Sequence, residues 1–229
     1  MKPVLLARGN FRESVFKRDG HKYIKYPRTM HLPWSESKTD DDRTLESTEA
    51  FKGKEVVVTL KMDGENTSLY SDGYCHARSI DAEPHHTQSW CRNLASKIAH
   101  EIPDGWRLCG ENLWAKHSIG YDNLKSYFYL FSVWNKENTC LSWAETQEWA
   151  ALLGLTTVPV IYQGLFNEKS IKAAFEPHRP NHEGYVIRLS SAFPYGQFKI
   201  AVAKFVRKNH VQTSNNWKRE KIEKNQLSG

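Results

Sequence analysis

The sequence contains no long hydrophobic run, and this absence excludes a large class of proteins. No stretch approaches the ~18 consecutive apolar residues that a membrane-spanning helix needs. The first residues, MKPVLLARGN, hold only a few apolar side chains before Arg8, too few for a secretory signal peptide. We therefore predict a cytoplasmic protein that has no membrane segment.

Cysteine is scarce and scattered along the chain. The four cysteines (Cys75, Cys91, Cys109 and Cys140) form no CxxC pair and have no spacing with histidine that is typical of metal ligands. We expect reduced thiols, which suit the cytoplasm, and no structural zinc site.

The sequence also lacks internal repeats, low-complexity segments and linkers rich in proline, glycine or serine. Its 229 residues are therefore predicted to form one domain. Hydrophobic residues make up 39% of the chain and aromatic residues 12%, which is enough for a packed core. We divide the domain into an irregular N-terminal arm (1–50), a catalytic core (51–206) and a basic C-terminal tail (207–229).

Charge is unevenly distributed. The formal net charge is +6, yet the stretch KTDDDRTLESTE at 38–49 is acidic. From Lys204 onward, seven lysines and arginines stand against Glu220 and Glu223. Lysine and arginine displace counterions from phosphate backbones, so the basic end indicates a polyanionic partner. The alternative is that Trp217 packs the tail onto the core.

Residue patterns predict mostly strands, with helices between groups of strands. β-Branched and aromatic runs bounded by turn residues predict strands at 55–61, 67–70, 74–78, 106–113, 128–134, 158–162, 184–189 and 198–206. Apolar spacing and capping residues predict helices at 88–100, 142–153 and 167–176. Because strands come in runs rather than alternating strictly with helices, we predict an α+β fold built on antiparallel sheets with flanking helices.

Charged residues stand beside glycine at the ends of three predicted strands. They are Lys61 in Lys61-Met62-Asp63-Gly64, Glu111 after Gly110, and Glu183 at the head of EGYVIR. Lys204 follows the last of these by about twenty residues. Glycine lets a backbone approach a ligand closely, so these strand ends are candidate binding positions.

In this order and spacing, the residues resemble the motifs of the covalent nucleotidyltransferases, which are the ATP-dependent ligases and the capping-type guanylyltransferases. The resemblance runs from about Val56 to Lys208 and includes the KxDG and EGxVxR patterns. Within this superfamily, EGYVIR and the general spacing look most like the RNA ligases, in particular the group that includes the second RNA ligase of T4 phage.

The resemblance implies a nucleotidyltransferase fold and a role for each matched residue. Lys61 would become covalently joined to the nucleotide, and Lys204 would contact its phosphates. The remaining roles would be Arg78 for ribose and phosphate, Glu111 for ribose, Phe131 for stacking on the purine, Gly64 for close approach, and Glu183 with Asp63 for a metal. Phe128 is an alternative stacking residue.

Three positions depart from the family pattern. Ser132 stands where relatives usually have aspartate, and Val202 replaces the first lysine of a lysine-x-lysine pair. Leu60 precedes the predicted nucleophile where many RNA ligases carry glutamate. The sequence also ends soon after the final motif, so we expect no OB domain.

The residue types suit the implied chemistry. A free lysine is almost wholly protonated at neutral pH, and only the neutral amine attacks phosphorus. We expect Lys204 and a divalent cation to lower the pKa of Lys61. Glu183 and Asp63 are the expected anchors for hydrated Mg²⁺ or Mn²⁺, which prefer carboxylate and water ligands.

The leading hypothesis is an ATP-dependent RNA ligase. Such an enzyme would form a lysyl-AMP intermediate, transfer AMP to an RNA 5′-phosphate and seal that end to a 3′-hydroxyl. No obligate protein partner is implied. Two alternatives stay open, a capping-type guanylyltransferase and a nucleic-acid-binding protein whose ligase site has decayed.

Overall fold

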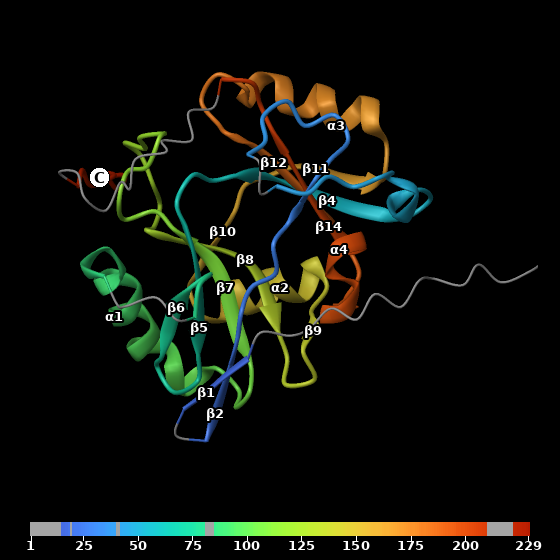
Figure 1. The fold of residues 1–229 in the computed structure, drawn as a ribbon. Helices are drawn as coiled ribbons and strands as arrows, with labels where there is room; N and C mark the ends of the chain where they lie inside the picture. Colours follow the sequence, from blue (N-terminus) through green and yellow to red (C-terminus); the bar gives the residue numbers. More distant parts are fainter. Residues whose placement is uncertain (1–14, 19, 40–41, 81–84, 210–221) are drawn as a thin grey trace, which may run out of the picture.

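Two β-sheets facing one another form the frame of the protein (Figure 1). The computed structural model describes residues 15–18, 20–39, 42–80, 85–209 and 222–229. The larger sheet has seven strands, in the order β13-β9-β8-β7-β5-β6 with β10 beside β8, and the smaller has the order β11-β4-β12-β14-β3. Most neighbouring strands are antiparallel, so the predicted α+β class with antiparallel sheets is confirmed.

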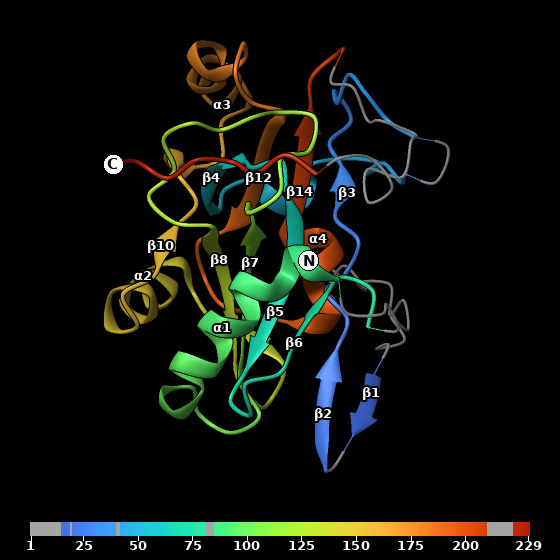
Figure 2. The same cartoon turned by 90° about the vertical axis from the view of Figure 1, so that its left-hand side faces the viewer.

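The larger sheet is built from residues 65–194. Its strands are β5 (Glu65–Tyr70), β6 (Cys75–Ala77), β7 (Arg107–Asn112), β8 (Phe128–Trp134), β9 (Thr139–Cys140), β10 (Thr156–Thr157) and β13 (Phe193–Pro194). Helices α1 (Ser89–Ile98) and α2 (Trp143–Leu152) pack against this sheet (Figure 2). Cys91, Ala95 and Ile98 of α1 are buried in a cluster with Leu130 of β8, which explains why an amphipathic helix forms here.

The smaller sheet combines distant parts of the chain. Its strands are β3 (Met30–His31), β4 (Glu55–Lys61), β11 (Val160–Leu165), β12 (Gly184–Leu189) and β14 (Val202–Val206). Helix α3 (Glu168–Phe175) buries Ile171 and Phe175, and the Phe175 ring lies 5.2 Å from that of Tyr185 in β12. Within the described residues, no helix combines the length and apolar character that a membrane span requires.

Local sequence signals account for several element boundaries. The S-x-x-E pattern at Ser142 forms the predicted capping box, in which the Ser142 hydroxyl accepts from Glu145 N and the Glu145 carboxylate accepts from Ser142 N at 2.8 Å. Gly154 follows α2 with a φ of 63°, a left-handed conformation that glycine adopts without strain. Gly184 is required by close packing, because a Cβ there would lie 1.9 Å from Phe205 O.

Two sequence-based predictions are wrong, one about the last strand and one about the N-terminal arm. Residues Phe198–Ala201 form a short helix, α4, instead of the first half of a strand, and β14 begins only at Val202. The N-terminal arm is also not wholly irregular, because β1 (Val15–Arg18) and β2 (His21–Ile24) form a hairpin and β3 joins the smaller sheet. The tail prediction falls partly on residues 210–221, including Trp217, which lie outside the described residues.

Candidate active site

Strand pairing in the smaller sheet places the predicted nucleophile beside the predicted metal-binding carboxylate. Lys61 ends β4 and pairs with Gly184, the first residue of β12, so Glu183 stands next to Lys61. On the other side of β12, Val186 pairs with Lys204 of β14. Residues separated by more than 120 positions in the sequence thus meet because three antiparallel strands align them.

A cavity of about 800 Å³ opens beside these strand ends. Its wall includes six of the predicted site residues, Lys61, Gly64, Arg78, Glu111, Phe131 and Lys204. The volume is that of a cofactor or nucleotide pocket. The two other predicted residues, Asp63 and Glu183, are buried next to this wall, with 8% and 4% of their surfaces exposed.

The Lys61 amine is held by the carboxylate of Glu183. Its Nζ donates to Glu183 Oε2 at 2.5 Å, and the exposed fractions of the two side chains are 25% and 5%. Burial alone would lower the pKa of the Lys61 amine. The carboxylates of Glu183 and Glu111, followed by that of Asp63, outweigh burial and raise this pKa to about 12.

We expected Lys204 and a divalent cation together to lower the pKa of Lys61, and Lys204 by itself does not bring this pKa below its ordinary value. Lys204 does not act as an unpaired cation, because its Nζ donates to Asp42 Oδ1 at 3.2 Å. The Asp42 carboxylate offsets the field of the Lys204 cation, and the carboxylates around Lys61 dominate. Without nucleotide and metal, the Lys61 amine is protonated.

Glu111 occupies the opposite wall, on β7 of the larger sheet. Its Oε1 accepts from Gly64 N at 3.2 Å. Gly64 is needed here, because a Cβ would lie 2.5 Å from Asn112 O. Burial raises the pKa of Glu111 to about 8; Lys61 opposes this rise, whereas Glu183 and Asp63 add to it.

The raised pKa of Glu111 makes this carboxyl a source of instability in the unliganded protein. A carboxyl whose pKa rises from its ordinary 4.5 to about 8 on folding destabilises the folded state above pH 4.5, increasingly up to about pH 8. Glu111→Gln removes the charge and keeps an acceptor for Gly64 N. We expect the variant to be more stable at pH 9 by about 1–3 kcal/mol, and no more stable than the parent at pH 4.

Thermal unfolding at both pH values measures this difference. A stabilisation of that size raises the midpoint by roughly 2–10 °C in a chain of this length. Glu148→Gln on the exposed face of α2 is the matched control and should leave the midpoint unchanged at either pH. Equal midpoints for Glu111→Gln and the parent at pH 9 would contradict the assignment of a buried charge.

The structure separates the two candidate stacking residues. Phe131 lines the cavity and packs edge-on against Tyr26 at a centroid distance of 5.3 Å. Phe128 is fully buried in the cluster of α1 and α2, where its ring packs against Gly110. The two phenylalanines are three positions apart on one strand and therefore face opposite sides of the sheet. Of the two, Phe131 is the one whose side chain is at the cavity.

Asp63 has two structural partners that the motif did not predict. Its backbone amide donates to Tyr121 Oη at 2.9 Å, and its Oδ2 accepts from Ile119 N at 2.8 Å. Both partners belong to the connection between β7 and β8, so this connection sets the position of the KxDG turn. His117 of the same connection lines the cavity, and burial lowers its pKa.

The C-terminal residues hold this connection in place (Figure 2). The side chain of Asn225, which is 2% exposed, donates from Nδ2 to Leu113 O at 2.8 Å and accepts at Oδ1 from Tyr121 N at 2.9 Å. The backbone oxygen of Asn225 accepts from Tyr127 Oη at 3.0 Å. The end of the predicted tail is therefore packed against the core.

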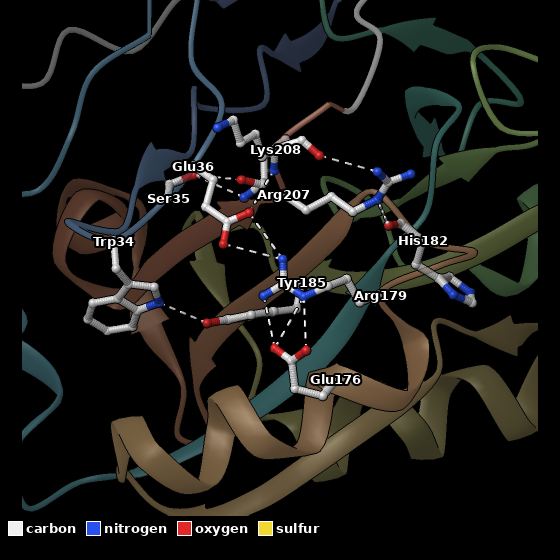
Figure 3. A network of polar contacts seen from close by, with 10 residues as sticks. Trp34, Ser35, Glu36, Glu176, Arg179, His182, Tyr185, Arg207 and Lys208 are labelled. Carbon is white, nitrogen blue, oxygen red and sulfur yellow. Dashed lines mark hydrogen bonds and ion pairs between the residues drawn. The ribbon is translucent and has the colours of Figure 1, made fainter.

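The first basic residues after β14 are engaged by the protein (Figure 3). Arg207 Nε donates to His182 O at 2.8 Å, and Arg207 N donates to Glu183 O at 3.0 Å. The backbone amide of Lys208 donates to Glu36 Oε2 at 2.7 Å. Arg207, the first residue of the basic tail for which a polyanionic partner was predicted, thus fixes the backbone that carries Glu183.

A second set of contacts in Figure 3 joins the N-terminal arm to the same corner. Arg179 lies between two carboxylates, 3.1 Å from Glu36 and 2.9 Å from Glu176. Trp34 Nε1 donates to Tyr185 Oη at 2.9 Å. These contacts fix the arm on the smaller sheet beside β14.

The carboxylates around Lys61 fit a divalent cation. Glu183 and Asp63 both raise the pKa of Lys61, so two carboxylates face one ammonium group even while Glu111 is protonated. Among the described residues, no group of three or more histidines, cysteines or acidic residues has the geometry of a complete metal site. Mg²⁺ and Mn²⁺ are commonly held by one or two carboxylates together with water and phosphate, so this arrangement suits them.

Sequence reasoning missed several cavity residues. Lys25, Tyr26 and Arg28 of the arm line the cavity, and they stand before the first motif in a segment with no recognisable pattern. Arg78 is exposed, at the end of β6, so its side chain faces solvent as well as the cavity.

A cavity of nucleotide size thus lies between two mostly antiparallel sheets, with Lys61 in its wall. The family model for RNA ligases matches residues 54–206. The chain belongs to the RNA ligase family. No curated protein matches the chain at the level of sequence.

Solved ligases share this fold. An archaeal ATP-dependent RNA ligase has a TM-score of 0.59 and 16% identity, with 85% of this chain and 51% of that chain covered. A putative ATP-dependent DNA ligase from Aquifex aeolicus has a TM-score of 0.57 and 16% identity, with coverage of 85% and 58%. For a mutant of Naegleria gruberi RNA ligase with ATP and Mn, the TM-score is 0.52, the identity 20% and the coverage 81% and 63%. The present chain thus spans about half to two thirds of the length of these structures.

Proposed function

We propose that this protein is an ATP-dependent RNA ligase that carries the nucleotide on Lys61. The observation that carries the proposal is the position of the Lys61 amine, which lies in the wall of a nucleotide-sized cavity and 2.5 Å from Glu183. A lysine at a strand end has no packing reason to lie against a buried glutamate with two further carboxyl groups near it. A lysine nucleophile, in contrast, needs neighbouring groups that fix the direction of its amine.

In the first step, the neutral Lys61 amine attacks the α-phosphorus of ATP. A P–N bond forms, the P–O bond to pyrophosphate breaks, and the amine gives up its proton. Lys204 faces the α-phosphate and stabilises the charge that develops on it. Glu111 binds the ribose, Arg78 binds ribose and phosphate, and Phe131 stacks on the adenine.

The unliganded site keeps the nucleophile inactive. Because the surrounding carboxylates hold the Lys61 amine in its protonated form, attack requires added positive charge. Glu183 and Asp63 would hold Mg²⁺ or Mn²⁺, which would supply that charge and screen the phosphates. Dependence on the metal is therefore expected in the first step.

The later steps require RNA with a 5′-phosphate and a 3′-hydroxyl. An oxygen of the 5′-phosphate attacks the lysyl-AMP phosphorus, forms a pyrophosphate link and releases Lys61. The 3′-hydroxyl then attacks the RNA 5′-phosphorus, forms the phosphodiester and displaces AMP. The cationic side chains of Lys25, Arg28 and Arg78 at the cavity suit the RNA phosphates.

We infer that the protein works in the cytoplasm and without an obligate protein partner. All four cysteines are buried free thiols, which supports a reducing compartment.

Covalent labelling separates the proposed function from its two alternatives. The protein is incubated with ATP or GTP labelled at the α-phosphate in the presence of Mg²⁺ or Mn²⁺, then denatured and resolved by electrophoresis. Label retained from ATP, and its release on adding 5′-phosphorylated RNA, supports the ligase. Label from GTP alone would support a capping-type guanylyltransferase, and no label from either would support a binding protein with a decayed site.

A further inference from the structure

Lys204 is paired with a carboxylate from a distant part of the chain. Its Nζ donates to Asp42 Oδ1 at 3.2 Å, and 15% of the lysine side chain and 10% of the aspartate side chain are exposed. Asp42 belongs to the acidic stretch of the N-terminal arm. The proposed nucleotidyl transfer leaves this contact unexplained.

The Asp42 carboxylate is held rigidly by its own segment. Its second oxygen, Oδ2, accepts from both Thr39 N and Thr39 Oγ1 at 3.0 Å and lies 3.1 Å from His31 Nε2. Burial would raise the pKa of Asp42, but the contacts with Thr39 and Lys204 hold it well below its usual range. Asp42 is thus an anion with a fixed position.

The contacts form a circuit that begins and ends on β14, in which the step from His31 Nε2 to Asp42 is a close approach without hydrogen-bond geometry. Val206 N donates to Ser35 Oγ at 2.9 Å, and Ser35 Oγ lies 2.7 Å from His31 Nδ1. His31 is adjacent to Asp42, and Asp42 returns to Lys204, two residues before Val206. Leu32 N also donates to Lys204 O at 2.8 Å, which fixes the backbone of the lysine. A circuit of this kind restricts where the amine can point.

On this geometry, we propose that Asp42 is a positioning residue for Lys204, which it orients toward the nucleotide phosphates and keeps in its cationic form. The inference rests on the proposed function, in which Lys204 faces the α-phosphate. It assigns a role in that site to the N-terminal arm, which lies outside the matched range 54–206.

The charged groups around Lys204 show why a partner is needed. Burial lowers the pKa of the Lys204 amine, and the Lys61 cation lowers it further. Asp42 and Glu183 oppose this fall, although the pKa stays below its ordinary value. His31, the remaining titratable neighbour on β3, is neutral at pH 7, because burial and Lys204 lower its pKa to about 4. Asp42 is therefore the anion in direct contact with Lys204 that keeps it charged.

Asp42→Asn tests the inference, since it preserves shape and removes the charge. We expect a fall of roughly tenfold in the rate of Lys61 labelling. We also expect the alkaline limb of the pH–rate profile to move to lower pH by roughly one unit, the usual size of an adjacent charge effect. A residue that acted only on folding would lower the whole profile without moving this limb. Glu46→Gln removes an exposed acid from the same arm and should change neither.

A second measurement does not depend on activity. The pKa of Lys204 is followed by NMR of ¹³C-labelled lysine in the parent and in Asp42→Asn, with the resonance assigned from Lys204→Arg. A fall of the Lys204 pKa by roughly one unit supports the inference. This outcome would hold even if ATP never labels the parent protein. Absence of labelling would reject only the ligase function. An unchanged Lys204 pKa together with an unmoved alkaline limb would overturn the inference. If Asp42→Asn fails to fold, Asp42→Glu, which restores the charge, should recover both folding and the alkaline limb.

Discussion

Replacing Lys61 by alanine is expected to abolish covalent labelling by ATP, with a loss of at least about 10³-fold. Lys61→Arg should fail equally, because a guanidinium stays protonated and cannot attack phosphorus. The arginine variant is the more informative of the two. It keeps a cation beside Glu183, so its folding is less disturbed than when a buried carboxylate is left unpaired.

Lys172→Ala is the matched control for this prediction. Lys172 also lies 2.5 Å from a glutamate, Glu168, but 44% of its side chain is exposed on α3. Its loss should leave labelling unchanged. Labelling of Lys61→Arg at the parental rate would show that another residue carries the nucleotide and would remove the basis of the proposed site.

Removing residues 222–229 is expected to impair both the stability of the protein and the labelling of Lys61. Asn225→Ala should reproduce most of this effect, because it leaves Leu113 O and Tyr121 N without their buried partner. Each such loss costs about 1–3 kcal/mol, so a total of roughly 2–6 kcal/mol is expected. Thermal unfolding gives the stability, and labelling well below the midpoint separates the effect on the site from unfolding.

The labelling defect follows from the path of contacts. Asn225 fixes Tyr121, and Tyr121 Oη accepts from the amide of Asp63, two residues after the proposed nucleophile. Gln226→Ala is the control, because the neighbouring side chain is exposed. Normal labelling by the truncated chain, together with a selective loss of RNA sealing, would instead support a purely RNA-binding role for the tail.

The strands that bear the motifs were predictable because local sequence dominates there. Residues 55–61, 128–134 and 184–189 form strands with the expected boundaries, since β-branched and aromatic residues favour an extended backbone in a buried sheet. The segment Phe198-Lys199-Ile200-Ala201 was wrongly predicted to be part of a strand, because Phe198, Lys199 and Ile200 alternate between apolar and polar as in a strand. In the structure, the 3₁₀ turn at Tyr195–Gln197 leads it into a helix.

The residues that hold the motif side chains were not predictable in this way. Asp42 meets Lys204 across 162 positions, and Asn225 meets Tyr121 across 104. No local pattern distinguishes Asp42 from its acidic neighbours or Asn225 from an ordinary polar residue. The predicted roles of individual site residues stay predictions, and the variants described above address them.

The pairing of β4 with β12 and of β12 with β14 has a consequence for how the protein is made. Lys61, Glu183 and Lys204 come together only when these three strands are aligned, and such long-range pairing forms slowly relative to local structure. A chain emerging from the ribosome holds Lys61 long before Lys204 has been synthesised. Under the proposed function, an incomplete or misfolded chain should not consume ATP, and covalent labelling would report the fraction of correctly folded protein in a preparation.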